Sequence, residues 1–231
     1  DNPGHNLYRS YLGISQYFLG QLLVDRGAYV EAEQELAEAH SHFLFLTEVD
    51  ESHKHWRSRR ANVERELGKL FRLSGRTGEG DEKLAHSVAN MKALLADELD
   101  NAEWRRNLLR SLLLQEDFRS RSTIATTLEP ATGTIREHIE ILLEHEPSNL
   151  DTRQLIAYAE ICEARAAPPD KAFNLLQTAL DMLEQYFPNT SNPRVLELKS
   201  EALSGLGRHE EAMELSNHLA EIGYRGLKGF P

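Results

Sequence analysis

An aromatic side chain returns every 48 residues along the first half of this chain. Tyr8, Trp56 and Trp104 stand at that spacing, since 56 − 8 = 48 and 104 − 56 = 48. Neighbouring positions repeat with them: Arg9, Arg57 and Arg105; Leu19-Gly20 and Leu67-Gly68; Gly27 and Gly75; Leu46, Leu94 and Leu142. A fixed period of this size is typical of a solenoid, in which each unit buries its apolar face only against its neighbours. The period therefore predicts a helical repeat array and argues against a catalytic function.

The composition agrees with an all-helical protein that has a sizeable core. Of the 231 residues, 40% are hydrophobic and 27% are charged, proportions that belong to folded rather than disordered chains. Leu, Ala and Glu are abundant while β-branched residues are sparse, which favours helix. The formal net charge of −11 argues against nucleic-acid binding, because that function needs a basic surface.

The single cysteine, Cys162, excludes an internal disulfide and any cysteine-rich metal site. It lies in an apolar helical run, so we expect a small buried side chain. No apolar run approaches the roughly 18 residues of a membrane span, so we expect no membrane insertion. The chain begins at Asp1 without a signal peptide, and we expect a fragment of a longer protein. The cytoplasm is slightly favoured, and the periplasm stays open for a membrane-anchored regulator.

Helical spacing and turn residues divide the chain into five helix-turn-helix repeats within one domain, 1–231. The expected repeats cover residues 1–48, 49–96, 97–146, 147–188 and 189–224. The first helix carries an apolar stripe of Tyr8, Leu12, Leu19, Leu22 and Leu23, and the second places Ala32, Leu36, Ala39 and Phe43 on one face. We expect an expanded glycine turn over 74–80, a long connection over 120–132, and a helix cap at Asn192.

Two segments of the chain resemble tetratricopeptide repeats. They are Leu19-Gly20 with Gly27-Ala28-Tyr29-Val30-Glu31-Ala32, Leu36 and Ala39, and, near the end, Gly207-Arg208-His209-Glu210-Glu211-Ala212. The period of 48 exceeds the roughly 34 residues usual in that family. Residues 100–106 are similar to a long-helix variety of the repeat, which occurs in bacterial multidomain proteins. In those proteins the repeats often follow a serine/threonine kinase or a DNA-binding regulator domain.

The resemblance implies an all-α fold, a right-handed α-α superhelix in which first helices line a concave groove and second helices form the convex back. The sequence departs from the family in the expanded turn of the second repeat and in the missing glycine turn of the third.

Basic residues gather on the first helices of the repeats and acidic residues on the second helices. Asn62, Arg65, Lys69 and Arg72 follow one helical stripe, and the same period brings residues of other repeats into line with it. The predicted partner-binding groove consists of Tyr17, Gln21, Asn62, Arg65, Lys69, Arg72, Arg106, Arg110 and Tyr158. Guanidinium groups suit carboxylates of an acidic peptide. The alternative is that these charges pair with one another across repeats.

The sequence therefore favours a non-catalytic protein-interaction module that binds an acidic or C-terminal peptide, or a partner domain, in a basic groove. The alternative is a regulatory, sensor or oligomerisation domain of a larger bacterial kinase or transcription regulator. A homodimer through a terminal repeat is compatible with either, because no polar capping helix is evident around Ile222.

No motif in the sequence calls for a cofactor or a catalytic group. The glycines of 75–80 lack the Gly-Lys-Ser/Thr ending of a phosphate loop. His40, His42, His53 and His55 fall close together, but residues two apart on a helix face different directions, so we expect no metal there. For Tyr8, Trp56 and Trp104 we expect packing against the preceding repeat rather than recognition.

Overall fold

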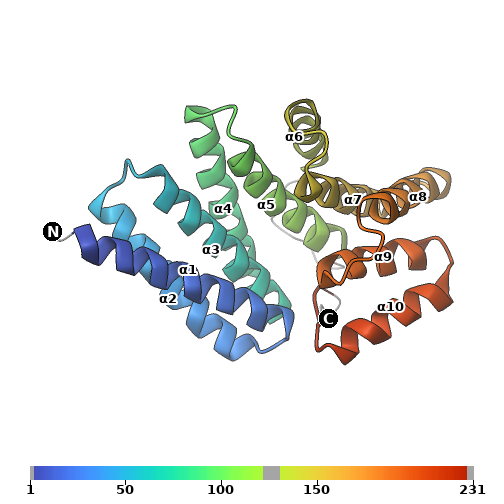
Figure 1. Cartoon of the computed structure of the whole chain (residues 1–231), viewed down its shortest axis with the longest axis horizontal. Helices are drawn as coiled ribbons and strands as arrows, with labels where there is room; N and C mark the ends of the chain where they lie inside the picture. Colours follow the sequence, from blue (N-terminus) through green and yellow to red (C-terminus); the bar gives the residue numbers. More distant parts are fainter. Residues whose placement is uncertain (1–2, 122–130, 228–231) are drawn as a thin grey trace. The chain divides into compact units, whose positions relative to one another are not determined.

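The computed structural model describes residues 3–121 and 131–227. These residues form ten α-helices and no strand, arranged in sequence as five consecutive helix pairs (Figure 1). The all-α helical repeat fold is confirmed. The helices are α1 (Pro3–Asp25), α2 (Tyr29–Val49), α3 (Lys54–Leu73), α4 (Thr77–Asp97), α5 (Ala102–Arg121), α6 (Thr132–His145), α7 (Leu150–Ala164), α8 (Pro169–Tyr186), α9 (Pro193–Gly205) and α10 (His209–Glu221).

The chain divides into two compact units. The first holds the chain up to Ser111, and the second spans Leu112–Gly226, so the division falls within α5. The single-domain organisation over 1–231 stays a prediction. None of the described helices is long and apolar enough to cross a membrane.

The first unit is built from two helical hairpins in which glycine lets the helices approach closely. α1 packs on α2, α3 packs on α4, and α2 packs on α3. A Cβ atom at Gly20 would lie 2.6 Å from Leu36 Cγ, and one at Gly68 would lie 2.6 Å from Leu84 Cγ. Both glycines and both leucines are 48 residues apart (68 − 20 = 48 and 84 − 36 = 48). The Leu-Gly pair therefore recurs in the sequence because the same close contact between a glycine and a leucine of the next helix occurs in both hairpins.

The turns of three hairpins use glycine in the left-handed region of backbone conformation. Gly27, Gly75 and Gly207 have φ angles of 74°, 81° and 80°, which glycine adopts without the steric cost of a Cβ atom. In each turn the next residue closes the helix end, as where Arg76 N–H donates to the carbonyl of Phe71 at 2.8 Å. These turns reverse the chain and let the second helix fold back on the first.

The expanded turn expected over 74–80 is wrong, because α4 begins at Thr77 and takes Gly78 and Gly80 into its first turn. The physical reason is a close helix crossing. A Cβ atom at Gly80 would lie 3.0 Å from the carbonyl oxygen of Gly68 and 2.6 Å from Arg72 Cγ. The glycine at position 80 is therefore required by contact with α3 rather than by a flexible loop.

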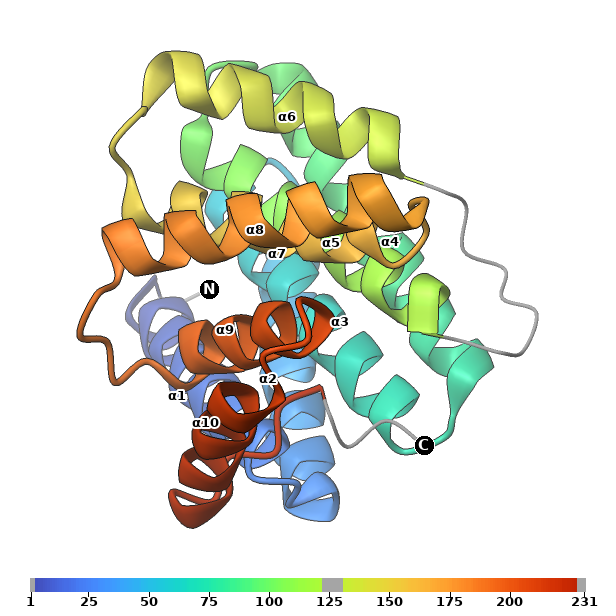
Figure 2. The same ribbon diagram turned by 90° about the vertical axis from the view of Figure 1, so that its right-hand side faces the viewer.

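The second unit contains α6 to α10 and the last part of α5. α7 packs on α8, α9 packs on α10, and α7 also contacts α6 and α9 (Figure 2). The expected cap at Asn192 is confirmed, since its side chain accepts hydrogen bonds from the backbone N–H groups of Arg194 and Val195. Most of the connection expected over 120–132 lies outside the described residues. The expectation that the third repeat lacks a glycine turn falls on the same residues.

Of the apolar stripe expected on the first helix, Leu23 is half-buried and the other four side chains are exposed. Tyr8 is 78% exposed, and the buried face of α1 consists instead of Ser10, Gly13, Tyr17, Gly20 and Val24. For α2 the expected face is confirmed: Ala32, Leu36, Ala39 and Phe43 are fully buried.

The packing role of the aromatic series holds for Trp104, which is 7% exposed, while Trp56 is only half-buried. It is wrong for Tyr8, whose side chain faces solvent. Cys162 is buried at 1% exposure, as expected.

Candidate functional site

Arg65, at the centre of the predicted groove, is a buried structural residue. Its side chain is 5% exposed. The guanidinium donates to Tyr17 Oη at 3.0 Å, to Asn62 Oδ1 at 2.8 Å and to Glu66 Oε1 at 3.1 Å. Burial disfavours the charged guanidinium, but the neighbouring Tyr17 and Glu66 outweigh burial and raise the pKa of Arg65. The guanidinium is thus hydrogen-bonded to three side chains of the protein itself.

Lys69 and Arg72, the next residues of the predicted stripe, are also paired. Lys69 Nζ lies 2.7 Å from Asp25 Oδ1, and Arg72 Nη1 lies 3.0 Å from Asp81 Oδ1. Arg72 has no solvent exposure at all. Breaking a buried pair of this kind leaves a charge without compensation, which costs about 3–5 kcal/mol. Direct contact of these side chains with a partner would therefore disturb the helix packing.

The remaining groove residues occupy similar settings. Gln21 hydrogen-bonds to Glu66, and Arg110 donates to Asn107 Oδ1 at 3.0 Å. Arg106 is half-buried and has interactions of its own within the chain. Tyr158 lies in the second unit, whereas the other predicted groove residues all lie in the first.

Tyr158 belongs to a buried network around Asp117. Its hydroxyl donates to Asp117 Oδ2 at 2.5 Å, Arg121 Nε donates to Asp117 Oδ1 at 2.6 Å, and Arg165 donates to the same oxygen. Burial would raise the pKa of Asp117, but the charges of Arg165 and Arg121 outweigh burial and lower it. Arg194 lies over the Tyr158 ring at 4.3 Å from its centroid. In the second unit, as in the first, the predicted groove residue is therefore bonded to other side chains of the chain.

Two of these contacts join residues that are one period apart. Arg65 and Tyr17 are separated by 48 residues, and so are Arg165 and Asp117. The period thus brings equivalent positions of successive first helices together, as the sequence indicates. The structure places the charges there in internal pairs, which is the alternative that the sequence left open. Binding of a partner through the nine groove residues stays a prediction.

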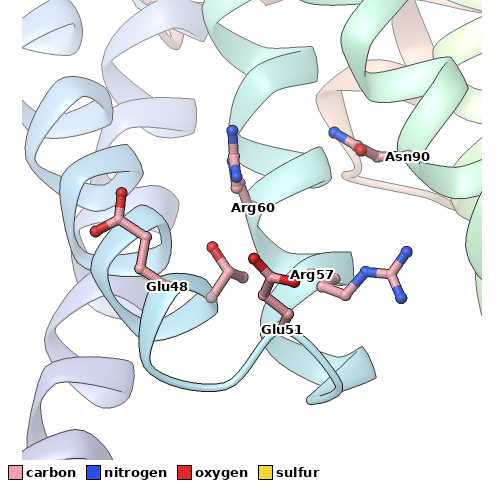
Figure 3. A pocket seen from close by; sticks show the side chains of 6 residues that line it. Glu48, Glu51, Arg57, Arg60 and Asn90 are labelled. Carbon is pink, nitrogen blue, oxygen red and sulfur yellow. The ribbon is translucent and has the colours of Figure 1, made fainter.

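A different hollow of the first unit holds arginine side chains near solvent. We call it the Arg57 pocket; its volume is about 410 Å³, and it is lined by Thr47, Glu48, Glu51, Arg57, Arg60 and Asn90. Figure 3 shows Arg57 and Arg60 extending from α3 and Asn90 from α4, with Glu48 at the end of α2 and Glu51 in the turn that follows. The pocket therefore combines two cations with two carboxylates on one rim.

A buried carboxylate contacts two of the side chains that line this pocket. The Glu64 side chain is 1% exposed; Asn90 Nδ2 donates to its Oε2 at 2.9 Å, and Arg60 Nε lies 3.3 Å from its Oε1. His40 Nε2 lies 3.4 Å from the same Oε1. Burial would raise the pKa of Glu64, but the His40 hydrogen bond and the Arg60 charge lower it.

Arg57 is the unengaged cation of the Arg57 pocket. It is half-buried, and within the described residues no hydrogen bond or ion pair involves its guanidinium. Arg57 and Arg60 lie on α3, one of the basic first helices, but neither belongs to the predicted set of groove residues. Glu51 and Asn90 come from a turn and from α4, so neither the period nor a single helical stripe connects them with Arg57.

The four clustered histidines have separate structural roles. His53 caps α3 by accepting from Trp56 N–H, and its ring stacks on the Trp56 ring at 3.7 Å and 8°. His55 Nε2 accepts from Arg59, while burial lowers the pKa of His42. In the part of the chain that the structure describes, no group of three or more His, Cys, Asp or Glu side chains could hold a metal ion.

Comparison with known proteins gives a weak structural likeness. No protein-family model and no curated protein sequence matches the chain. A solved structure of a MamA mutant is 18% identical with a TM-score of 0.42, and the match covers 96% of this chain and 99% of that one. MamA AMB-1 is 20% identical with a TM-score of 0.36, covering 95% and 94% of the two chains. Similarities this low identify neither an activity nor a partner.

Proposed function

We propose that this chain is a non-catalytic protein-interaction module that holds an acidic segment of a partner protein in the Arg57 pocket. The observation that carries the proposal is the state of the arginines in the first unit. Arg65 and Arg72 are buried and paired, whereas Arg57 lines an open hollow and no described residue binds its guanidinium. A planar guanidinium binds a carboxylate through two parallel hydrogen bonds, which gives both affinity and orientation.

Asn90 and Arg60 shape this site because Glu64 holds them in place. With Asn90 donating to Glu64 at 2.9 Å, its amide oxygen remains as an acceptor for a backbone N–H of the partner. The terminal nitrogens of Arg60 can add to the charge of Arg57, since Arg60 contacts Glu64 through Nε. A partner carboxylate would therefore meet a prearranged set of groups, which reduces the entropy lost on binding.

The carboxylates of Glu48 and Glu51 limit how much negative charge a partner can bring to the pocket. Glu48 and Glu51 are exposed and line the same hollow, and the whole chain carries a net charge of −11. A long uniformly acidic chain would meet repulsion there. We therefore expect a short acidic segment, with specificity arising from the position of one or two carboxylates.

The proposal is tested with a fluorescein-labelled decapeptide of alternating Glu and Ala, and with a Lys-Ala decapeptide as the charge-reversed probe. Fluorescence anisotropy at low salt should show binding of the Glu-Ala peptide, and the affinity should fall as salt is added. Arg57→Ser should weaken binding at least tenfold, because a charge-assisted contact is lost. Glu51→Gln should strengthen binding, because it removes a like charge from the rim.

The matched control is Arg26→Ser, which removes one exposed arginine from the same unit outside the pocket. It should leave the affinity within twofold of the wild type. Equal binding by the Arg57→Ser and wild-type proteins, or equal binding of the two peptides, would refute the assignment.

A further inference from the structure

The first helix exposes a continuous apolar face. Its exposed side chains are Leu7 (55%), Tyr8 (78%), Tyr11 (59%), Leu12 (50%), Phe18 (55%), Leu19 (44%) and Leu22 (50%). They follow helical spacing and, with exposed Ser15 in the middle, form one stripe along α1, which we call the α1 face. Exposed apolar patches of this extent mark interaction surfaces.

Equivalent positions in the later repeats are covered by other helices. Leu22 corresponds to Leu70 (22 + 48 = 70), which has no exposure. Leu12 corresponds to Leu108 two periods on (12 + 96 = 108), which is 1% exposed. At these two positions, a side chain that faces solvent on α1 has a buried counterpart on a later first helix. The α1 face consists of leucine, tyrosine and phenylalanine, residues typical of a contact between packed helices.

The α1 face is also free of charge. Residues 10–24 contain no Asp, Glu, Lys or Arg, in a chain whose net charge is −11. Two copies of such an acidic protein repel one another across most of their surface. The α1 face is a place where two copies can approach without bringing carboxylates together.

The opposite end of the chain does not complement this face. α10 carries Glu210, Glu211, Glu214 and Glu221, and its exposed large apolar side chain among the described residues is Met213. Ile222, which follows α10, is also 44% exposed, so the last hairpin shows two exposed large apolar side chains where α1 shows seven. A homodimer through the last repeat stays a prediction. A head-to-tail contact between α10 and the α1 face would bury glutamates against leucine, which is unfavourable.

We propose that two copies of this chain associate through the α1 face, with the two α1 helices antiparallel about a twofold axis near Ser15. The area is sufficient. Three aromatic rings exposed by 55–78% offer about 400 Å² in all, since each can bury about 150–250 Å². The four half-exposed leucines add a few hundred Å², and the total approaches the roughly 800 Å² per partner of a stable interface.

A pocket at one end of the α1 face provides an anchor for this association. Its volume is about 460 Å³, and its lining includes Leu7, Tyr11 and Ile14 of α1 and Trp56 of α3. In an antiparallel pair centred near Ser15, the pocket would receive the helix turn that contains Leu19 and Leu22 of the second copy. The twofold symmetry makes this contact twice, as in isologous dimers. Apolar anchors seated in pockets carry much of the energy of such interfaces.

The experiment is sedimentation velocity of the whole chain over a hundredfold range of concentration. The wild type should shift from monomer to dimer, and Leu12→Glu should weaken dimerisation at least a hundredfold, because it brings two carboxylates to the centre of the apolar contact. Val30→Glu is the matched control: it also places Glu at an exposed apolar position, 83% exposed, on α2 and not among the residues of the α1 face. It should dimerise like the wild type. Circular dichroism must show equal helicity for all three proteins.

A second measurement keeps the orientation testable. Ser15→Cys should form an intermolecular disulfide under mild oxidation, since the two copies of residue 15 would lie close together, whereas Ser148→Cys, at another exposed serine, should not. A monomer at every concentration, or dimers unaffected by Leu12→Glu, would overturn the proposal. Crosslinking at Ser148→Cys as fast as at Ser15→Cys would overturn the antiparallel arrangement. Peptide binding through Arg57 is independent of these outcomes, because the Arg57 pocket contains no residue of α1.

Discussion

The substitution Gly80→Ala tests the close crossing of α3 and α4. A Cβ atom at position 80 would lie 2.6 Å from Arg72 Cγ, 3.0 Å from Arg72 N and 3.0 Å from Gly68 O. Two of these three atoms are backbone, and the Arg72 side chain is held by its ion pair with Asp81, so none can move away easily. Overpacking of this kind costs about 1–3 kcal/mol, while Ala gains up to about 1 kcal/mol over Gly in a helix.

We therefore expect Gly80→Ala to lower the free energy of unfolding by about 1–2 kcal/mol, which corresponds to a fall in Tm of about 2–8 °C for a chain of this size. The matched control is Gly78→Ala in the same helical turn, where an added Cβ atom meets nothing within 4 Å. Gly78→Ala should leave stability unchanged or raise it by up to about 1 kcal/mol. Urea unfolding followed by circular dichroism measures both. If Gly80→Ala is as stable as Gly78→Ala, the crossing is looser than described.

Two further predictions concern a helix cap and a buried charge. Asn192→Ala should lower the free energy of unfolding by about 1 kcal/mol in urea unfolding, because the side chain accepts from two backbone N–H groups at the start of α9; an unchanged midpoint would contradict that cap. Asp117→Asn should destabilise the protein at pH 7 by about 2 kcal/mol, because Arg121 and Arg165 each lose one of two carboxylate partners and keep Glu201. Since the pKa of Asp117 is lowered by folding, its contribution is present above the unfolded pKa and disappears as pH falls through the folded pKa. The difference between Asp117→Asn and the wild type should therefore narrow below pH about 4, and a difference independent of pH would refute the charge assignment.

The helical architecture could be predicted from the sequence because its signals are local. Turn glycines, the Asn192 cap and the Ala32–Phe43 face of α2 depend on neighbouring residues or on one helix, and all are found in the structure. The segment 74–80 was misread because glycine in a sequence has two physical uses, a left-handed turn and a close helix crossing. Gly75 serves the first and Gly80 the second, and only the position of α3 distinguishes them.

The functional surface was harder to predict, because the same period that aligns side chains also lets them pair. The helical stripe predicts Arg65 as a groove residue, yet in the structure it donates to Tyr17 one repeat away and is buried. Likewise, the helical spacing of the leucines and aromatics of α1 indicates a buried face, yet seven of these side chains are exposed in this structure. Both outcomes depend on which helix lies opposite, and a single sequence pattern does not contain that information.

The most direct test of this account compares the stability of two arginine variants on α3. Arg65→Met leaves the Glu66 carboxylate and the Tyr17 hydroxyl without their buried partner, whereas Arg57→Met removes a guanidinium that no described residue engages. Differential scanning calorimetry should show a clear fall in Tm for Arg65→Met, equivalent to at least about 2 kcal/mol, and no change beyond about 1 °C for Arg57→Met. Equal Tm values for Arg65→Met and the wild type would contradict the claim that the arginine stripe ties successive repeats together.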